Sequence, residues 1–211
     1  MTTTYLDEAI EPAPVERYLT RAARMRSDTR YVLTGFPVGL AGIVLCFGGF
    51  AIGLGLAALW IGVPLAVGSM LLARGMAIAE RARIARVLGE PSTAPLYRGG
   101  SRRQVLTDPQ SWRDLAHAML RFVPSTIATS LVVSWWAGLL GGLSWALWGW
   151  ALPDGPQDHD VPGLLGLGDG YLTGVGFYLV VAAFFALTLP TVTRAAAVLE
   201  ARFAQGLLVR P

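Results

Sequence analysis

Long stretches without a charged residue dominate the chain. Forty-three residues separate Arg30 from Arg74, and two further uncharged stretches cover residues 122–153 and 170–193. An α-helix rises about 1.5 Å per residue and the hydrocarbon core of a bilayer is about 30 Å thick, so the first stretch is long enough for two crossings and each of the others for one. The pattern predicts four membrane-spanning helices, at 31–51, 55–75, 123–150 and 171–193.

The polar segments between these stretches differ in charge. Segments 16–30, 74–121 and 194–211 contain five, nine and three Arg, whereas segment 154–169 contains four Asp and no Arg. Arg-rich flanks remain on the cytoplasmic side of a membrane. We therefore expect a multi-pass protein of the cell membrane with both termini in the cytoplasm. Segment 1–30 then forms a cytoplasmic region with a short surface helix, 91–107 a cytoplasmic loop and 151–170 an extracellular loop.

Two parts of the chain resemble each other. Residues 72–91 align with 192–211 at an offset of 120, which matches Arg74 with Arg194 and Glu80 with Glu200. The sequence thus predicts an all-α membrane domain over 31–211, built as two tandem hairpins. Both hairpins enter and leave on the cytoplasmic side as a parallel repeat, and their exit helices continue as amphipathic cytoplasmic extensions.

Local signals predict helix ends in the middle segment. Gly89 is suited to end the first exit helix, and Asp108 followed by Pro109 is suited to start the next. Glycines at 48–55 are expected to form the tight turn of the first hairpin, with Trp60 beside it. After Pro109 we expect a helix in the inner membrane interface, with His117 on its polar side, facing water or lipid headgroups. Its apolar stripe consists of Trp112, Leu115, Met119 and Phe122.

Composition supports a membrane protein. The 211 residues are 54% hydrophobic and 15% charged, compared with about 25% charged in soluble domains. The single Cys46 excludes a disulfide framework within the chain. The net charge is only +3, and the placement of Arg explains it by topology and contact with anionic lipid, so we expect no nucleic-acid partner.

Few residues carry recognisable chemistry. No catalytic set, cofactor motif or metal-ligand motif is present in the sequence, and the predicted spans contain no charged residue apart from Arg74 at the end of the second. One candidate ligand site is the outer-loop group Asp154, Asp158, His159 and Asp160, which suits a divalent cation or a cationic peptide, or else is a solvated turn. Pairs of small residues favour close helix packing, within the chain or in a dimer: Gly35 and Gly39, Gly49 and Gly53, Gly138 and Gly142.

Several of these features together resemble a known family. Tyr31 with the Gly-Phe-Pro-Val-Gly-Leu run at 35–40, Arg74-Gly75, and Asp108-Pro109 followed by Trp-Arg-Asp-Leu at 112–115 are similar to the "Putative sensor" domain of actinobacterial membrane proteins. That domain is often the N-terminal input module of histidine kinases. The resemblance implies a membrane-embedded sensor domain and brings no catalytic residues with it. The 211 residues contain neither a phospho-acceptor helix nor an ATP-binding domain, so we expect no kinase core.

These observations favour a non-enzymatic role in the membrane. The first hypothesis is a signal-input domain that relays an extracytoplasmic or bilayer stimulus to a cytoplasmic partner. The alternative is an accessory subunit of a membrane complex such as an ABC-type exporter. The expected partners are the lipid bilayer and either a protein, namely a histidine kinase or a transporter, or a second copy of the chain.

Overall fold

The computed structural model describes residues 21–90, 97, 101–151 and 160–208, and these residues form helices without a β-strand. The all-α prediction is confirmed. Four helical stretches are long and apolar enough to cross a membrane, in agreement with the predicted number of spans: Arg21–Gly55, Gly62–Leu88, Pro109–Ala151 and Tyr171–Leu208.

The first hairpin is longer than its hydrophobic stretch. Helix α1 (Arg21–Ala41), a π-helical segment η2 (Gly42–Gly48) and α2 (Gly49–Gly55) follow one another without a break, and α3 (Gly62–Leu88) returns beside them. The predicted turn at 48–55 is wrong, because Gly49 and Gly53 lie inside the helix, where their missing side chains let Ser69 and Ala66 approach. The turn instead occupies residues 56–61, with Trp60 in the left-handed region at φ 59° and 87% exposed.

The middle segment begins and ends as its local signals predict. Gly89 ends α3 with φ 71°, and Asp108 starts α5 (Pro109–Leu120) by accepting a hydrogen bond from the Gln110 amide. The expected loop at 91–107 contains a helix, α4 (Arg102–Thr107). The Ser101 and Gln104 side chains accept hydrogen bonds from each other's backbone amides at its start, and this capping box stabilises a helix where the sequence predicted a loop.

The second hairpin consists of α6 (Phe122–Trp148) and α8 (Tyr171–Leu208), with the short helices η4 (Gly149–Ala151) and α7 (Val161–Leu164) between them. Trp135 donates a hydrogen bond to Thr188 at 2.9 Å, and its ring packs edge-on against Phe185 at 5.5 Å. Nearer the closed end, Trp145 packs against Tyr178 at 4.3 Å. Helix α8 continues 15 residues past the predicted span end at 193, so the exit extension belongs to the same helix.

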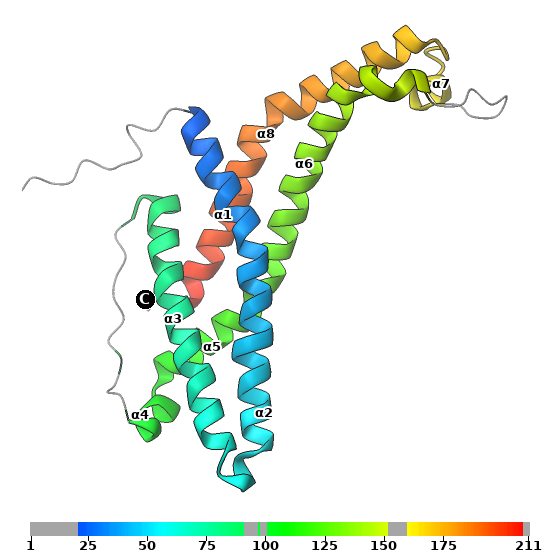
Figure 1. Cartoon of the computed structure of the whole chain (residues 1–211). Coiled ribbons are helices and arrows are strands. Elements are labelled where there is room, and N and C mark those ends of the chain that lie inside the picture. Colours follow the sequence, from blue (N-terminus) through cyan, green and yellow to red (C-terminus); the bar gives the residue numbers. More distant parts are fainter. Residues whose placement is uncertain (1–20, 91–96, 98–100, 152–159, 209–211) are drawn as a thin grey trace, which may run out of the picture.

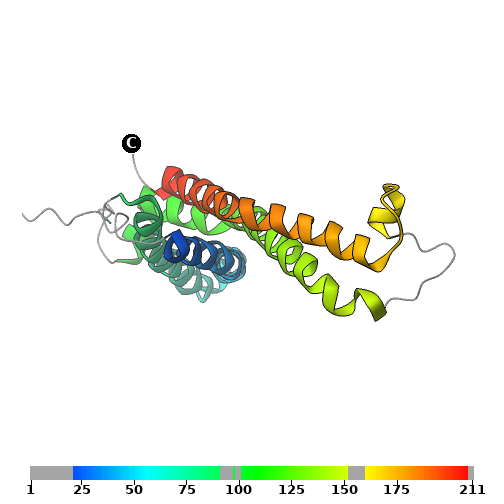
Figure 2. The ribbon, with the colours of Figure 1, turned by 90° about the horizontal axis from the view of Figure 1, so that it is seen from above.

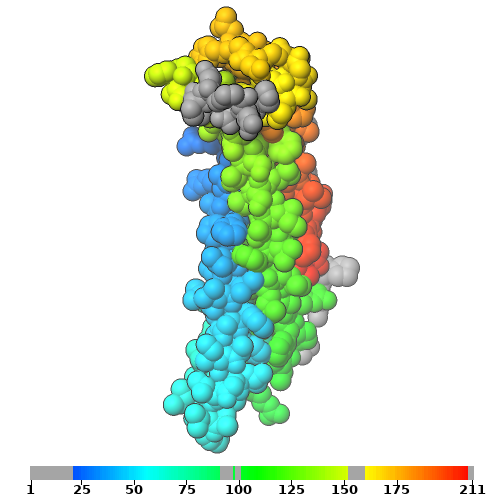
Figure 3. Space-filling view, turned by 90° about the vertical axis from the view of Figure 1, so that its right-hand side faces the viewer, coloured from blue at the N-terminus to red at the C-terminus, as the bar shows by residue number. Residues whose placement is uncertain are grey.

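The two hairpins point in opposite directions along the molecule. The α2–α3 turn lies at one end and α7 at the other (Figures 1 and 3). Seen from above, α6 and α8 lean away from the first hairpin (Figure 2). The predicted parallel arrangement is therefore wrong: α3 and α8 run antiparallel, so Arg194 of α8 donates to the Val87 carbonyl near the end of α3. The antiparallel packing places charged residues of both helices at the same level.

Candidate functional site

Two carboxylates from different hairpins meet one guanidinium near the middle of the molecule. Arg121, between α5 and α6, donates hydrogen bonds to Glu80 Oε2 on α3 and, at 3.4 Å, to Glu200 Oε1 on α8. The Glu80 and Glu200 side chains are each 1% exposed, and the Arg121 side chain is 4% exposed. Burial of an ion costs several kcal/mol unless an opposite charge and hydrogen bonds compensate. The three groups are therefore interdependent.

Hydroxyl groups from the other two long helices complete this site. Tyr31 of α1 donates to Glu80 Oε1 at 2.9 Å, and Ser125 of α6 donates to Glu200 Oε1. All four long helices thus contribute a side chain or a flanking residue to one connected group. We call this group the polar centre: Tyr31, Glu80, Arg121, Ser125 and Glu200.

A second buried ion pair joins α3 to α5. Arg81 donates to Asp114 Oδ1 at 2.9 Å, and Tyr97 donates to Asp114 Oδ2 at 2.8 Å. Arg81 also donates to the Leu208 carbonyl at 3.3 Å, so the C-terminal end of α8 joins the same network. Burial and the Asp114 carboxylate raise the pKa of the Tyr97 phenol to about 12.

A third buried ion pair lies about two helical turns earlier in α3. Arg74 donates to Asp108 Oδ2 at 2.8 Å and to Ser111 Oγ, while its guanidinium stacks 4.5 Å above the Tyr97 ring. Arg74, Arg81 and Glu80 therefore fix α3 against the segment that begins at Asp108 and ends at Arg121.

Helix α5 presents its polar side to the protein. Asp114 is 0% and His117 2% exposed, so the expectation that His117 faces water or lipid headgroups is wrong. In the predicted apolar stripe, Leu115 is buried, Met119 and Phe122 are partly buried, and Trp112 is 46% exposed and packs edge-on against Phe50. The spacing of apolar residues predicts two faces on α5, but the charged residues on α3 determine which of the two faces the protein interior.

The predicted packing glycines lie at close helix contacts. A β-carbon on Gly39 would lie 3.2 Å from Phe122 Cα, one on Gly53 2.5 Å from the Ala66 amide nitrogen, and one on Gly142 2.6 Å from the Tyr178 carbonyl oxygen. The other three would meet side chains: Gly35 the Glu200 carboxylate, Gly49 the Ser69 hydroxyl, and Gly138 the Phe185 ring.

The predicted outer-loop site lies mostly outside the described residues, which include none of Asp154, Asp158 and His159. Asp160 is described and acts as a helix cap. Its carboxylate accepts hydrogen bonds from the Val161 amide at 2.7 Å and from the Tyr178 hydroxyl at 2.7 Å.

The polar centre itself was not predicted as a site. Glu80 and Glu200 were recognised as equivalent positions of the repeat, and this was the signal that could have found it. In a parallel repeat, equivalent residues lie on separate helices at the same depth, so the alignment alone does not pair Glu80 with Glu200 through Arg121. The antiparallel packing of α3 and α8 makes the two equivalent residues neighbours of one guanidinium.

Four long apolar helices around a buried, internally paired set of charges define an all-helical membrane protein. The chain belongs to the family described as "Putative sensor", whose model matches residues 31–208. This match covers every residue of the polar centre. Neither the curated proteins nor the solved structures contain a match to the chain.

Proposed function

We propose that the protein is a non-enzymatic signal-input domain in which the polar centre links the packing of the two hairpins. A stimulus acting on either hairpin changes the bonding of Arg121 with Glu80 and Glu200, and the hairpin that ends on the cytoplasmic side then transmits the change to a cytoplasmic partner. Membership of the sensor family supports the input role. The observation that carries the mechanism is that one guanidinium is shared by carboxylates of both hairpins.

The shared guanidinium favours two alternative packings. The structure shows a short bond from Arg121 to Glu80 and a longer one, 3.4 Å, to Glu200. A modest shift of α8 relative to α3 exchanges these distances without exposing either charge to lipid. Packed interfaces that have two arrangements of similar free energy are the usual basis of switching, and a ligand shifts them by binding one arrangement more tightly.

Distance measurements test this proposal. The Cys46→Ala protein is placed in lipid nanodiscs and carries spin labels at Ile78→Cys on α3 and Leu199→Cys on α8, both exposed positions. The distance between the labels reports the separation of the two helices. Glu200→Gln removes one of the two charges that compete for Arg121 and keeps the shape of the side chain. We expect it to change the distance distribution measured by double electron–electron resonance.

Arg86→Gln is the control, because Arg86 is exposed on α3 and, among the described residues, bonds only the Ala82 carbonyl of its own helix. An unchanged distribution in Glu200→Gln, or an equal change in both variants, contradicts the proposal. Isolation of the full chain from its own membranes in mild detergent tests the relay. A stoichiometric kinase supports the input role, whereas a stoichiometric exporter subunit overturns it in favour of an accessory subunit.

A further inference from the structure

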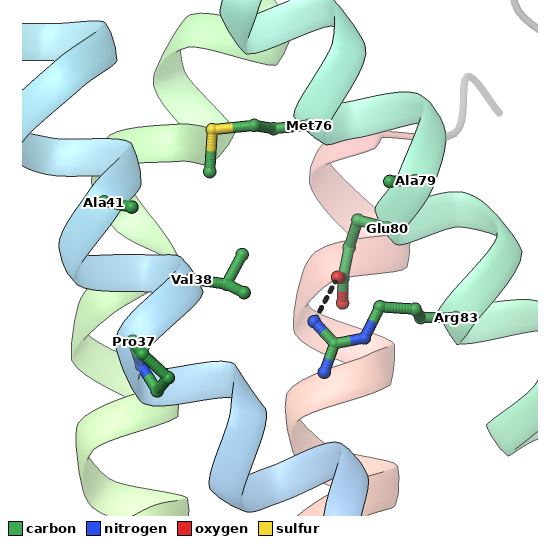
Figure 4. Close-up of a pocket in the computed structure, with 7 residues that line it drawn as sticks. All are labelled: Pro37, Val38, Ala41, Met76, Ala79, Glu80 and Arg83. Atoms are coloured by element: carbon green, nitrogen blue, oxygen red, sulfur yellow. Dashed lines mark hydrogen bonds and ion pairs between the residues drawn. The ribbon is translucent and has the colours of Figure 1, made fainter.

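A pocket of about 380 Å³ lies between α1 and α3, next to the polar centre (Figure 4). Its volume is within the range of about 300–1,000 Å³ that is usual for small-molecule sites. Pro37 and Ala79 are exposed, so the pocket opens at the surface of the helices. It has apolar walls and one charged end, formed by Pro37, Val38, Ala41, Met76, Ala79, Glu80 and Arg83.

The backbone of α1 is irregular beside this pocket. Pro37 has no amide hydrogen and cannot bond the carbonyl four residues earlier. The π-helical segment Gly42–Gly48 begins one residue after Ala41, and such segments often occur at functional sites. Ala41 on α1 and Ala79 on α3 are short, so they leave space that Val38 and Met76 only partly fill, as Figure 4 shows.

At the charged end of the pocket, the positively charged Arg83 is more accessible than the negatively charged Glu80. Glu80 is 1% exposed and already accepts from Tyr31, Arg83 and Arg121. The Arg83 side chain is 17% exposed. Its guanidinium donates to Glu80, to the Tyr31 carbonyl at 2.9 Å and to Thr34 Oγ1 at 2.6 Å. A ligand entering from the surface thus meets the guanidinium before the carboxylate.

We propose that this pocket binds an anionic amphiphile, namely an acyl chain with a carboxylate or phosphate head. The head bonds Arg83, since guanidinium pairs strongly with both groups, and the chain lies against Val38, Ala41 and Met76. Arg83 bridges α1 and α3, so an anion there competes with Glu80 and loosens one partner of the polar centre. The inference rests on the proposed function only in this last step and names the class of its stimulus.

Binding is measured with the full chain in nanodiscs of phosphatidylcholine. The probes are a fluorescent palmitate, for a free fatty acid, and lysophosphatidylglycerol as its competitor, for a phospholipid head. Lysophosphatidylcholine and an alkylamine test the charge requirement. We expect both anions to bind at least about tenfold more tightly than the zwitterion or the cation, because a charge-assisted hydrogen bond contributes that much or more. Similar affinities for all four amphiphiles overturn the proposal.

Two variants locate the site. Ala41→Phe fills the pocket and is expected to abolish palmitate binding, while the same substitution at the exposed Ala51 of α2 leaves it unchanged. Arg83→Gln is expected to weaken both anions about tenfold or more and to leave lysophosphatidylcholine unaffected. If Ala41→Phe binds palmitate as tightly as the wild-type protein, the proposed binding site is wrong. Binding at the site with no change in the Ile78–Leu199 spin-label distance leaves the site standing and contradicts the proposed relay, so the two failures are distinguishable.

Discussion

At the scale of single residues, Arg121 is the one positively charged partner of Glu200 among the described residues. Ser125 and Arg121 are the donors to the Glu200 carboxylate within the described residues, whereas Glu80 also bonds Tyr31 and Arg83. Removal of Arg121 therefore leaves a buried carboxylate with a single hydroxyl partner. Loss of one partner of a buried ion pair costs more than the pair contributes when intact, because the remaining charge is uncompensated.

We accordingly expect Arg121→Gln to lower the free energy of unfolding by about 3–5 kcal/mol, measured by denaturant titration in detergent. Adding Glu200→Gln should recover part of this loss in a double-mutant cycle. The control is Arg86→Gln, since Arg86 is exposed and bonds only the Ala82 carbonyl among the described residues. Equal losses for Arg121→Gln and Arg86→Gln would contradict the buried pairing.

Tyr97 gives a second prediction, for high pH. Its pKa is raised to about 12, by burial first and then by the Asp114 carboxylate. The folded protein therefore favours the neutral phenol, and this stabilisation is complete below the unfolded pKa of about 10 and is lost as pH rises through about 12. At pH 8 we expect the wild-type protein to have a higher melting temperature than Tyr97→Phe, and we expect this difference to shrink between pH 10 and pH 12. A constant difference across that interval would exclude the raised pKa.

At the scale of helices, glycine positions separate close contacts from open faces. A β-carbon on Gly53 would lie 2.5 Å from the Ala66 amide nitrogen of the facing helix, whereas one on Gly75 meets no atom within 4 Å. Gly53→Ala must push α2 away from α3, at a cost of about 1–3 kcal/mol. Gly75→Ala should instead stabilise by about 0.5–1 kcal/mol, because alanine loses less backbone freedom in a helix.

Thermal unfolding of the two variants in the same detergent measures this contrast. The substitution is identical in both cases, so their difference isolates the helix contact. If Gly53→Ala is as stable as Gly75→Ala, then α2 and α3 do not approach each other as closely as described.

Helix ends were predictable from sequence because each depends on a few neighbouring residues. Gly89 and the Asp108-Pro109 pair fix where α3 ends and α5 begins, and both follow from local backbone chemistry. The inward direction of Asp114 and His117 was not predictable in this way. It depends on Arg81, which is 33 residues from Asp114 in sequence and 2.9 Å from it in the structure.

At the scale of the whole molecule, the direction of the hairpins is the main difference from the sequence prediction. Arginine counts favour both hairpin ends on the outer side, but the structure places the α2–α3 turn and α7 at opposite ends (Figure 1). Charge counts treat each segment by itself, whereas the antiparallel packing of α3 on α8 is decided by contacts between residues more than 100 positions apart.

Cysteine labelling in intact cells discriminates between the two arrangements. Ile61→Cys reports the α2–α3 turn and Leu165→Cys reports the region after α7, and both positions are exposed. In a Cys46→Ala background, we expect a membrane-impermeant maleimide to label one of the two in intact cells and the other only after permeabilisation. Labelling of both from the outside would instead support the parallel arrangement.

The distance from the polar centre to the hairpin ends has a mechanical consequence. Twenty residues of unbroken helix separate Gly35, beside Glu200, from Gly55, which is a rod of about 30 Å. A rotation of roughly 6° at its inner end moves its outer end by about 3 Å by the same geometry. A small rotation at the polar centre would therefore produce a larger displacement at the α2–α3 turn, where a distance measurement detects it more easily.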